Sequence, residues 1–159
     1  MNSVYLLLGS NLGNRINNIA QAIRMLTDTV GTIKTASSLY ETEPWGKEDQ
    51  PFFCNRVVCM QMPLSPEALL SHIQAIEEKL GKVIQEKWGP RSIDIDILYY
   101  NDCIVDTPDL KIPHKELPQR RFVLVPLCEI APRFVHPVYQ QTNIVLLRNC
   151  LDLHKVWIL

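Results

Sequence analysis

The feature that most constrains the fold is a short run in which isoleucine and aspartate alternate, Ile93-Asp94-Ile95-Asp96-Ile97. A period of two predicts a β-strand, because successive side chains of a strand point to opposite faces of its sheet. We therefore expect Ile93, Ile95 and Ile97 to face a core. Asp94 and Asp96 then share the other face, with side chains about 7 Å apart.

Two carboxylates this close repel each other unless a positive charge lies between them, and no basic residue separates Asp94 from Asp96. Carboxylate oxygens are preferred ligands of Mg²⁺, so the pair predicts a metal site. A solvent-facing strand is the alternative, although aspartate is uncommon in strands. The preceding Trp88-Gly89-Pro90-Arg91 favours the metal site, because a Gly-Pro loop brings an aromatic ring and a phosphate-binding arginine beside the acidic pair.

Length and composition indicate an ordinary globular protein, and we expect residues 1–159 to form a single domain with a substantial core. The formal net charge of −1 gives no support for binding to nucleic acid or to a membrane surface. No apolar run is long enough to span a bilayer, and the first residues lack the pattern of a signal peptide. The five cysteines are scattered and odd in number, which predicts a protein of the reducing cytoplasm without disulfides or zinc.

The hydrophobic pattern predicts strands and helices in the order βαββαβ over the first hundred residues. Strands are expected over residues 4–9, 32–41, 52–62 and from 93 onward. Helices are expected over residues 14–28, 65–80, 122–130 and 142–150. The order is typical of an α+β, ferredoxin-like fold, in which an antiparallel sheet carries helices on one face. Short helices and strands are expected to follow this core toward the C-terminus.

Glu77 and His114 are polar residues in unusual positions, and each allows both a functional and a purely structural interpretation. Glu77 lies at the edge of the apolar stripe of the second helix, where it either reaches solvent or becomes a third acidic group near the cation. His114 lies in a proline-containing loop, and Arg120 and Arg121 follow it within eight residues. These side chains suit a polyanion, and a structural histidine beside a solvated basic patch is the alternative. The chain has no P-loop motif, so bound phosphates would depend on metal, arginine and lysine.

Asn55 is predicted to point from a strand face beside Phe53, with Trp45 in the preceding loop. Its carboxamide can both donate and accept hydrogen bonds. It could therefore read the edge of a flat heterocycle whose faces stack on aromatic rings. Simple packing is the alternative for this pattern.

Four short motifs, which follow one another over nearly the whole chain, resemble those of the 6-hydroxymethyl-7,8-dihydropterin pyrophosphokinase family. They are Gly9-Ser10-Asn11-Leu12-Gly13-Asn14-Arg15; Thr42-x-Pro44 before Gln50-Pro51-x-Phe53-x-Asn55; Trp88-Gly89-Pro90-Arg91-x-x-Asp94-x-Asp96; and Pro113-His114 followed by Arg120-x-Phe122-Val123-Leu124 and Glu129-Ile130-x-Pro132. The third motif is the specific one, whereas the first is weak when it stands alone.

The resemblance implies an enzyme of folate biosynthesis that moves the pyrophosphoryl group of ATP to the hydroxymethyl group of 6-hydroxymethyl-7,8-dihydropterin. It implies two Mg²⁺ ions held by Asp94 and Asp96, with ATP as co-substrate. The partners expected are these small molecules, with neither nucleic acid nor membrane, and the protein is expected to be a monomer.

The resemblance also assigns roles to individual residues. The catalytic residues it implies are Arg91, Asp94, Asp96 and Arg120. The ATP-binding residues it implies are Glu77, Lys82, Trp88, Arg91, Ile97, His114 and Arg120. The pterin-binding residues it implies are Thr42, Pro44, Trp45, Phe53, Asn55, Asp94 and Phe122, with Phe53 and Phe122 as the rings on either side of the pterin.

The chain departs from the family pattern at three positions. Lys82 and Ile84 stand where many members carry arginines; Lys82 keeps the charge without the bidentate fork, and Ile84 loses both. Phe53 stands where tyrosine is frequent, which removes a hydroxyl and keeps the ring.

The loop over residues 82–91 is polar and carries Trp88 and Arg91 toward the acidic strand, so we expect it to close as a lid when both substrates are bound.

Two other classes of protein share the predicted topology. A ligand-binding module without catalysis would explain the fold and leave the acidic strand face unexplained. An RNA-binding domain would need exposed aromatic rings on the sheet and a basic surface, and the near-neutral charge disfavours it.

Overall fold

A computed structural model of the chain describes residues 1–81 and 91–159. The expectations for Lys82, Ile84 and Trp88, and for a closing lid, fall on residues 82–90 and lie outside the described residues.

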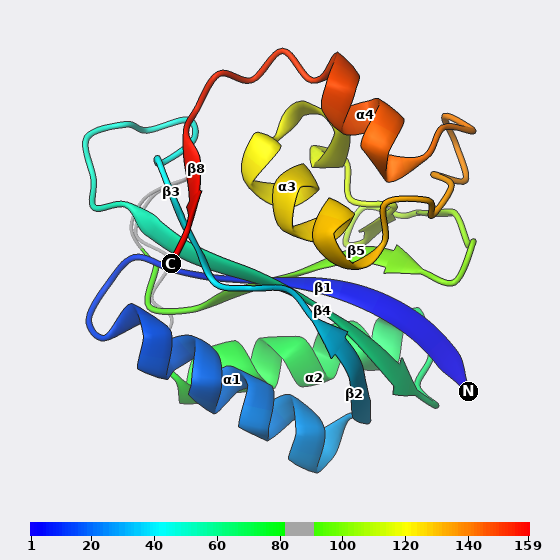
Figure 1. Cartoon of the computed structure of the whole chain (residues 1–159). Coiled ribbons are helices and arrows are strands. Elements are labelled where there is room, and N and C mark those ends of the chain that lie inside the picture. Colours follow the sequence, from blue (N-terminus) through cyan, green and yellow to red (C-terminus); the bar gives the residue numbers. More distant parts are fainter. Residues whose placement is uncertain (82–90) are drawn as a thin grey trace.

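An antiparallel sheet runs through the middle of the molecule and has helices on both faces (Figure 1). Its strand order is β5-β1-β4-β3-β8, and β2 also pairs with β4. The strand bounds are β1 Asn2–Ser10, β2 Thr32–Ala36, β3 Tyr40–Thr42, β4 Phe53–Met62, β5 Asp94–Tyr100 and β8 Val156–Ile158. A separate hairpin pairs β6 (Val105–Asp106) with β7 (Lys111–Ile112). The predicted order of strands and helices and the antiparallel, ferredoxin-like arrangement are confirmed.

Helices α1 (Arg15–Thr29) and α2 (Pro66–Lys79) cover one face of the sheet (Figure 1). Each begins after a residue that caps it: the side chain of Asn14 accepts a hydrogen bond from the backbone N–H of Asn17, and that of Ser65 accepts one from Ala68. Their apolar stripes bury against alternate residues of the strands, and these residues form the larger core. It includes Leu6, Leu8, Ile19, Leu26, Met60, Leu69, Ile73, Ile95 and Ile97.

Helices α3 (Arg121–Ile130) and α4 (Asn143–Asn149) lie on the opposite face, after a short 3₁₀ helix, η1 (Leu117–Gln119). They bury a second cluster that contains Leu7, Val57 and Leu98 from the sheet and Val123, Leu124, Leu127 and Leu146 from the helices. The C-terminal part therefore adds a layer to the face that the βαββαβ core alone leaves open. This layer covers part of the face, and the uncovered part forms a pocket.

The structure differs from the sequence prediction at two strands. The strand expected over 32–41 is divided into β2 and β3, because the side chain of Ser37 takes the place of a backbone group in the ladder. Its Oγ accepts a hydrogen bond from the N–H of Val57 at 3.0 Å, and the N–H of Ser37 donates to the Val57 carbonyl at 2.8 Å. Short strands were expected toward the C-terminus without bounds, and one of them, β8, pairs with β3 at the edge of the sheet, with Trp157 opposite Glu41.

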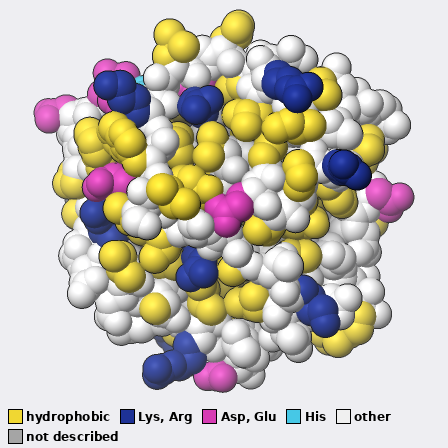
Figure 2. All heavy atoms as spheres, viewed as in Figure 1, with side chains coloured by type: hydrophobic (Ala, Val, Ile, Leu, Met, Phe, Trp, Pro, Cys, Tyr) yellow, Lys and Arg dark blue, Asp and Glu magenta, His cyan; other side chains and the backbone are white. Residues whose placement is uncertain are grey.

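Charged side chains are dispersed on the face seen in Figure 2, where single lysine and arginine side chains lie among hydrophobic and uncharged ones. A basic surface of the kind that RNA-binding domains use does not gather on this face. Among the residues that the structure describes, no helix is both long and apolar enough to cross a membrane.

A buried carboxylate joins α2 to the beginning of β5. Glu77 is 8% exposed, and its Oε2 accepts a hydrogen bond from the backbone N–H of Ile95 at 2.9 Å. Ile95 lies between Asp94 and Asp96, so this contact fixes the strand segment that carries the acidic pair.

We expect Glu77→Ala to lower the free energy of unfolding by about 1–3 kcal/mol, because it leaves a buried N–H without an acceptor. Urea unfolding measures the change, with Glu78→Ala as the control because Glu78 is exposed on the same helix. Equal unfolding midpoints for the two variants would contradict this role of Glu77.

Candidate active site

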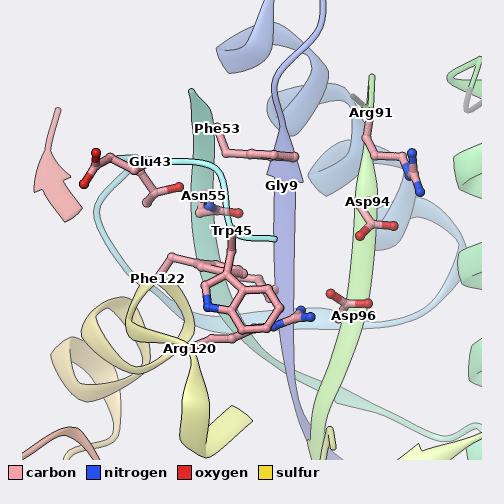
Figure 3. A pocket seen from close by; sticks show the side chains of 12 residues that line it. Gly9, Glu43, Trp45, Phe53, Asn55, Arg91, Asp94, Asp96, Arg120 and Phe122 are labelled. Atoms are coloured by element: carbon pink, nitrogen blue, oxygen red, sulfur yellow. Dashed lines mark hydrogen bonds between the residues drawn. The ribbon is translucent and has the colours of Figure 1, made fainter. Parts of the chain in front are cut away.

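A pocket opens on the part of the sheet that α3 leaves uncovered (Figure 3). Its empty space, including open solvent at the mouth, is about 620 Å³, and its lining comes from β1, β3, β4, β5, the start of α3 and the segment after β3. The lining residues are Leu7, Gly9, Thr42, Glu43, Trp45, Phe53, Asn55, Arg91, Asp94, Asp96, Arg120 and Phe122. Nine of the residues implied by the family resemblance therefore meet in one cavity, although their motifs are far apart in the sequence.

Asp94 and Asp96 form the acidic side of this pocket. In the antiparallel ladder they lie opposite Gly9 and Leu7 of β1, which line the same pocket. Figure 3 shows both carboxylates pointing into the cavity between Arg91 and Arg120. The isoleucines of β5 are buried in the larger core, as the alternation predicts. Two carboxylates that share one strand face are an oxygen donor set suited to Mg²⁺.

A larger metal cluster is not found among residues 1–81 and 91–159: no group of three His, Cys, Asp or Glu side chains there could hold an ion. Glu77 lines neither this pocket nor the second one described below. Its Oε2 accepts the backbone N–H of Ile95 in β5. Through this bond Glu77 supports the strand that carries the acidic pair.

Asn55 is held in a defined orientation at the back of the pocket. It is 3% exposed, and its Nδ2 donates a hydrogen bond to Oγ1 of the buried Thr42 at 2.8 Å. Gly9 makes room for the amide, because a Cβ at that position would lie 2.5 Å from the Asn55 Oδ1. Figure 3 shows the rings of Phe53 and Phe122 on opposite sides of this amide. The arrangement is a slot for a flat ring whose edge meets Asn55.

Arg120 lies between the aromatic slot and the acidic pair. Its guanidinium carbon is 4.6 Å from the centroid of the Trp45 ring and 5.7 Å from that of Phe122, distances at which a cation interacts with an aromatic face. The Arg120 Nε is buried, and no hydrogen-bond acceptor reaches it within the described parts of the chain. Burial lowers the pKa of Arg120, while Asp96 and Glu116 act in the opposite direction. A buried N–H without an acceptor points to an anionic ligand at this position.

A second pocket lies on the other side of Asp96. Its empty space, including open solvent at the mouth, is about 610 Å³, and its lining residues are Leu70, Ile95, Asp96, Ile97, Asp109, Leu110, Lys111, His114 and Lys115. Asp96 lines both pockets, so the two cavities meet at the acidic pair. Ile97 and His114, two of the residues implied for ATP, lie here and not in the first pocket. Pro44 is buried beside Trp45 and lines neither pocket.

His114 presents a neutral ring to this junction. Its Nδ1 accepts a hydrogen bond from the backbone N–H of Glu116 at 3.1 Å, which leaves the proton of the neutral ring on Nε2. Nε2 lies 3.8 Å from the Asp96 Oδ1. Burial lowers the pKa of His114 to about 4, and the charge of Arg120 acts in the same direction. At neutral pH the histidine is therefore an uncharged N–H donor beside the acidic pair.

Asn11 is a residue whose role the sequence reasoning missed, although it belongs to the first motif. It is 3% exposed, and its Nδ2 donates to the Gln50 Oε1 and the Pro51 carbonyl, both at 2.9 Å. Its Oδ1 accepts from the backbone N–H of Arg91 at 2.7 Å. One amide thus joins the end of β1, the segment before β4 and the residue that precedes the acidic strand. An asparagine directly after an apolar strand was the signal in the sequence.

Comparison with known proteins shows to which family the chain belongs. The sequence profile of the 7,8-dihydro-6-hydroxymethylpterin-pyrophosphokinase family matches residues 5–132. The chain is 44% identical over 141 residues to the 2-amino-4-hydroxy-6-hydroxymethyldihydropteridine pyrophosphokinase of Aquifex aeolicus, which covers 89% of the chain and 88% of that protein. The enzyme of the same name from Methylorubrum extorquens is 44% identical over 136 residues, covering 85% of the chain and 86% of that protein.

Some relatives are much longer. The folic acid synthesis protein of Pneumocystis carinii is 47% identical over 137 residues, which are 86% of this chain and 18% of that protein. Among solved structures, that of the Plasmodium falciparum HPPK-DHPS with pteroate superimposes with a TM-score of 0.76 and covers 92% of this chain and 42% of that one. At 20% identity this match shows the fold. The profile match and the bacterial relatives establish more: the chain belongs to the 7,8-dihydro-6-hydroxymethylpterin-pyrophosphokinase family.

Proposed function

We propose that this chain transfers the pyrophosphoryl group of ATP to the hydroxymethyl group of 6-hydroxymethyl-7,8-dihydropterin, with AMP and the pterin diphosphate as products, in folate biosynthesis. Family membership supports the reaction. The structural observation that carries the proposal is that Asp96 lines both pockets. A reaction between two substrates needs their reacting groups to meet, and these cavities meet at the acidic pair.

The first pocket suits the pterin. The proposed position of the bicyclic ring is between Phe53 and Phe122, where both of its faces are covered by aromatic side chains. Asn55 would then read the edge of the pyrimidine ring, because the Thr42 hydroxyl already fixes one side of its amide. The hydroxymethyl group would point along β5 toward Asp94 and Asp96.

The second pocket suits ATP. Leu70 and Ile97 offer an apolar surface to the base, and Lys111 and Lys115 add positive charge at its rim. His114 and Arg120 would donate to phosphate oxygens, with Arg91 on the other side of the acidic pair. Lys82 and Trp88 keep the ATP-binding roles proposed from the resemblance.

Asp94 and Asp96 would hold the Mg²⁺ ions, two in the proposal, and these would supply positive charge to the phosphates. The side chains around them orient the substrates, since phosphoryl-type transfer depends on in-line position and charge neutralisation more than on a strong base. Arg120 would stabilise charge that develops on the transferred group. We assign no general base.

The setting of the reaction is also part of the proposal. We propose a monomer in a reducing cytoplasm, which the five cysteines support because all of them are free thiols.

Incubation with Mg²⁺, ATP and 6-hydroxymethyl-7,8-dihydropterin tests the function. We expect AMP and the pterin diphosphate in equal amounts, read by phosphorus NMR in a single-turnover mixture. Stoichiometric ADP with a pterin monophosphate would overturn the reaction type, and binding of both ligands without turnover would favour a ligand-binding module.

We expect Asp94→Asn and Asp96→Asn to reduce turnover about a thousandfold or more, because each removes a charge that the metal and phosphates require. Melting temperatures should change little, since both side chains face the pocket and not the core. Asp102→Asn is the control because Asp102 is exposed. Near-normal, Mg²⁺-dependent turnover in the double variant would remove the metal assignment.

Gly9→Ala is expected to weaken pterin binding about tenfold to a hundredfold, because the new Cβ displaces the Asn55 amide and its hydrogen bonds. Affinity for a non-hydrolysable ATP analogue should be unchanged. Calorimetry measures both, with pterin titrated in the presence of the analogue and Asn55→Ala as the companion variant. Equal losses for the two ligands would show that the slot does not distinguish them.

A further inference from the structure

The last nine residues form an extended segment beside the active site. After α4 the chain returns along the sheet edge and ends in β8, next to the segment that follows β3 (Figure 1). The backbone N–H of Glu43 donates to the Lys155 carbonyl at 3.1 Å, and the N–H of Lys155 donates to the Glu43 Oε1 at 2.5 Å. Glu43 lines the first pocket, so this segment touches the wall of the site. It lies beyond residues 5–132, which the family profile matches.

The segment has its polar side chains turned inward. Successive residues of an extended chain point to opposite sides. Leu151 and Leu153 are 92% and 91% exposed, whereas the side chain of Asp152 is 4% exposed and that of His154 is 25% exposed. Hydrophobic burial alone would favour the reverse orientation. Polar contacts of Asp152 and His154 therefore fix which side of the segment faces the protein.

Asp152 caps the helix that begins at the active site. Its Oδ2 accepts a hydrogen bond from the backbone N–H of Arg121, the first residue of α3, at 2.9 Å. The cap position itself is occupied by Arg120, which makes no side-chain capping bond. A carboxylate at this end of a helix is favourable because it satisfies a free N–H and opposes the helix dipole. The cap of the helix that presents Arg120 is thus supplied by the C-terminal segment.

His154 connects this cap to the segment that carries Trp45. Its Nδ1 lies 2.5 Å from the Asp152 Oδ1, and its Nε2 lies 3.1 Å from the Glu48 Oε1. Ionised carboxylates only accept hydrogen bonds, so both contacts are satisfied together only by the doubly protonated, charged ring. Bonds to Asp152 and Glu48 raise the pKa of His154, against the effect of burial.

The charged groups around His154 come from three elements. They are Asp152 and Lys155 on its own segment, Glu43 and Glu48 on the segment after β3, and Arg121 at the start of α3. Acidic groups outnumber basic ones, which favours the charged ring.

We propose that protonated His154 is a positioning residue for the pterin side of the active site. Its contacts with Glu48 and Asp152, which we call the latch, hold residues 43–50 against the capped start of α3 and so keep Trp45 beside Arg120. The inference rests on the proposed function, since it assigns the consequence of the latch to pterin binding.

The latch has a pH dependence with a defined sign. The pKa of His154 in the folded protein is raised above its ordinary value of 6.5. The stabilisation is therefore present at lower pH and is lost as the pH rises through the raised pKa. Above it the neutral ring has one proton for two carboxylates. The contact with Glu48 or with Asp152 then lacks its donor, and residues 43–50 are released.

The test compares His154→Gln, Glu48→Gln and their double variant with Leu153→Ser, a control on the same segment whose side chain faces solvent. Hydrogen exchange of the amides of residues 43–50 at pH 6.5 reads the latch without any substrate. The KM for the pterin and kcat are measured at pH 6.5 and 8.5. Thermal melting checks that each variant is folded, and Glu48→Gln carries the test if His154→Gln is not, because the Glu48 side chain is 75% exposed.

We expect each single variant to speed exchange and raise the pterin KM about twofold to fivefold at pH 6.5, the range of a single exposed ion pair, with kcat little changed. The double variant should add nothing further, because both changes break one contact. The KM ratio of His154→Gln to the unaltered protein should approach one at pH 8.5, and Leu153→Ser should match the unaltered protein throughout.

Unchanged exchange and unchanged KM in both single variants would overturn the latch, as would fully additive effects in the double variant. Faster exchange with an unaltered KM would overturn the positioning role. If the unaltered protein transfers no pyrophosphoryl group, the proposed function fails, and exchange together with calorimetric pterin affinity still decides the latch.

Discussion

The repulsion between Asp94 and Asp96 is the constraint on which the rest of the site depends. Two carboxylates on one face of β5 are tolerated only where positive charge is brought to them. The fold meets this requirement from both sides, with Arg91 in the segment that leads into the strand and Arg120 at the start of α3. His114 contributes a neutral donor, because a further full charge beside Arg120 is disfavoured by burial. The proposed Mg²⁺ ions and phosphates would complete this balance.

The sequence predicted those parts of the fold that depend on local periodicity. The period of two in β5 and the apolar stripes and caps of α1 and α2 follow from residues that are neighbours along the chain. Strand β8 and the division between β2 and β3 depend on partners far away in sequence, namely Glu41 for Trp157 and Val57 for Ser37. Such partners leave no periodic trace, so the bounds of β8 and this division could not be predicted.

The same distinction applies to the site. Residue types alone suggested the acidic pair, a ring-flanked amide at Asn55 and a cationic group around Arg120, and the family resemblance added Phe122 as the second ring of the slot. Neither source predicted that Gly9 makes room for the Asn55 amide or that Asn11 ties two loops to β1, because both effects arise from contacts across the sheet. The slot therefore depends on the lack of a side chain at Gly9 as well as on the aromatic rings.

The carboxylates of this protein form two groups: some accept hydrogen bonds from backbone N–H groups, and others face the pocket. Glu77 accepts the Ile95 amide, Asp152 accepts the Arg121 amide, and Glu129 accepts the amide and hydroxyl of Ser38 together with the hydroxyl of Tyr40. Each of these carboxylates fixes the beginning or end of an element that carries the site, and backbone donors give it its position.

Burial raises the pKa of Glu129, but its hydrogen bonds from Tyr40 and Ser38 outweigh burial and lower it, while burial and the Glu129 carboxylate raise the pKa of Tyr40 to about 12. Asp94 and Asp96 differ in that their carboxylates point into the pocket. The acidic residues that hold strands and helices in place are therefore different from those that face the pocket. The separation explains why the site can carry a dense negative charge on a strand whose backbone stays fixed.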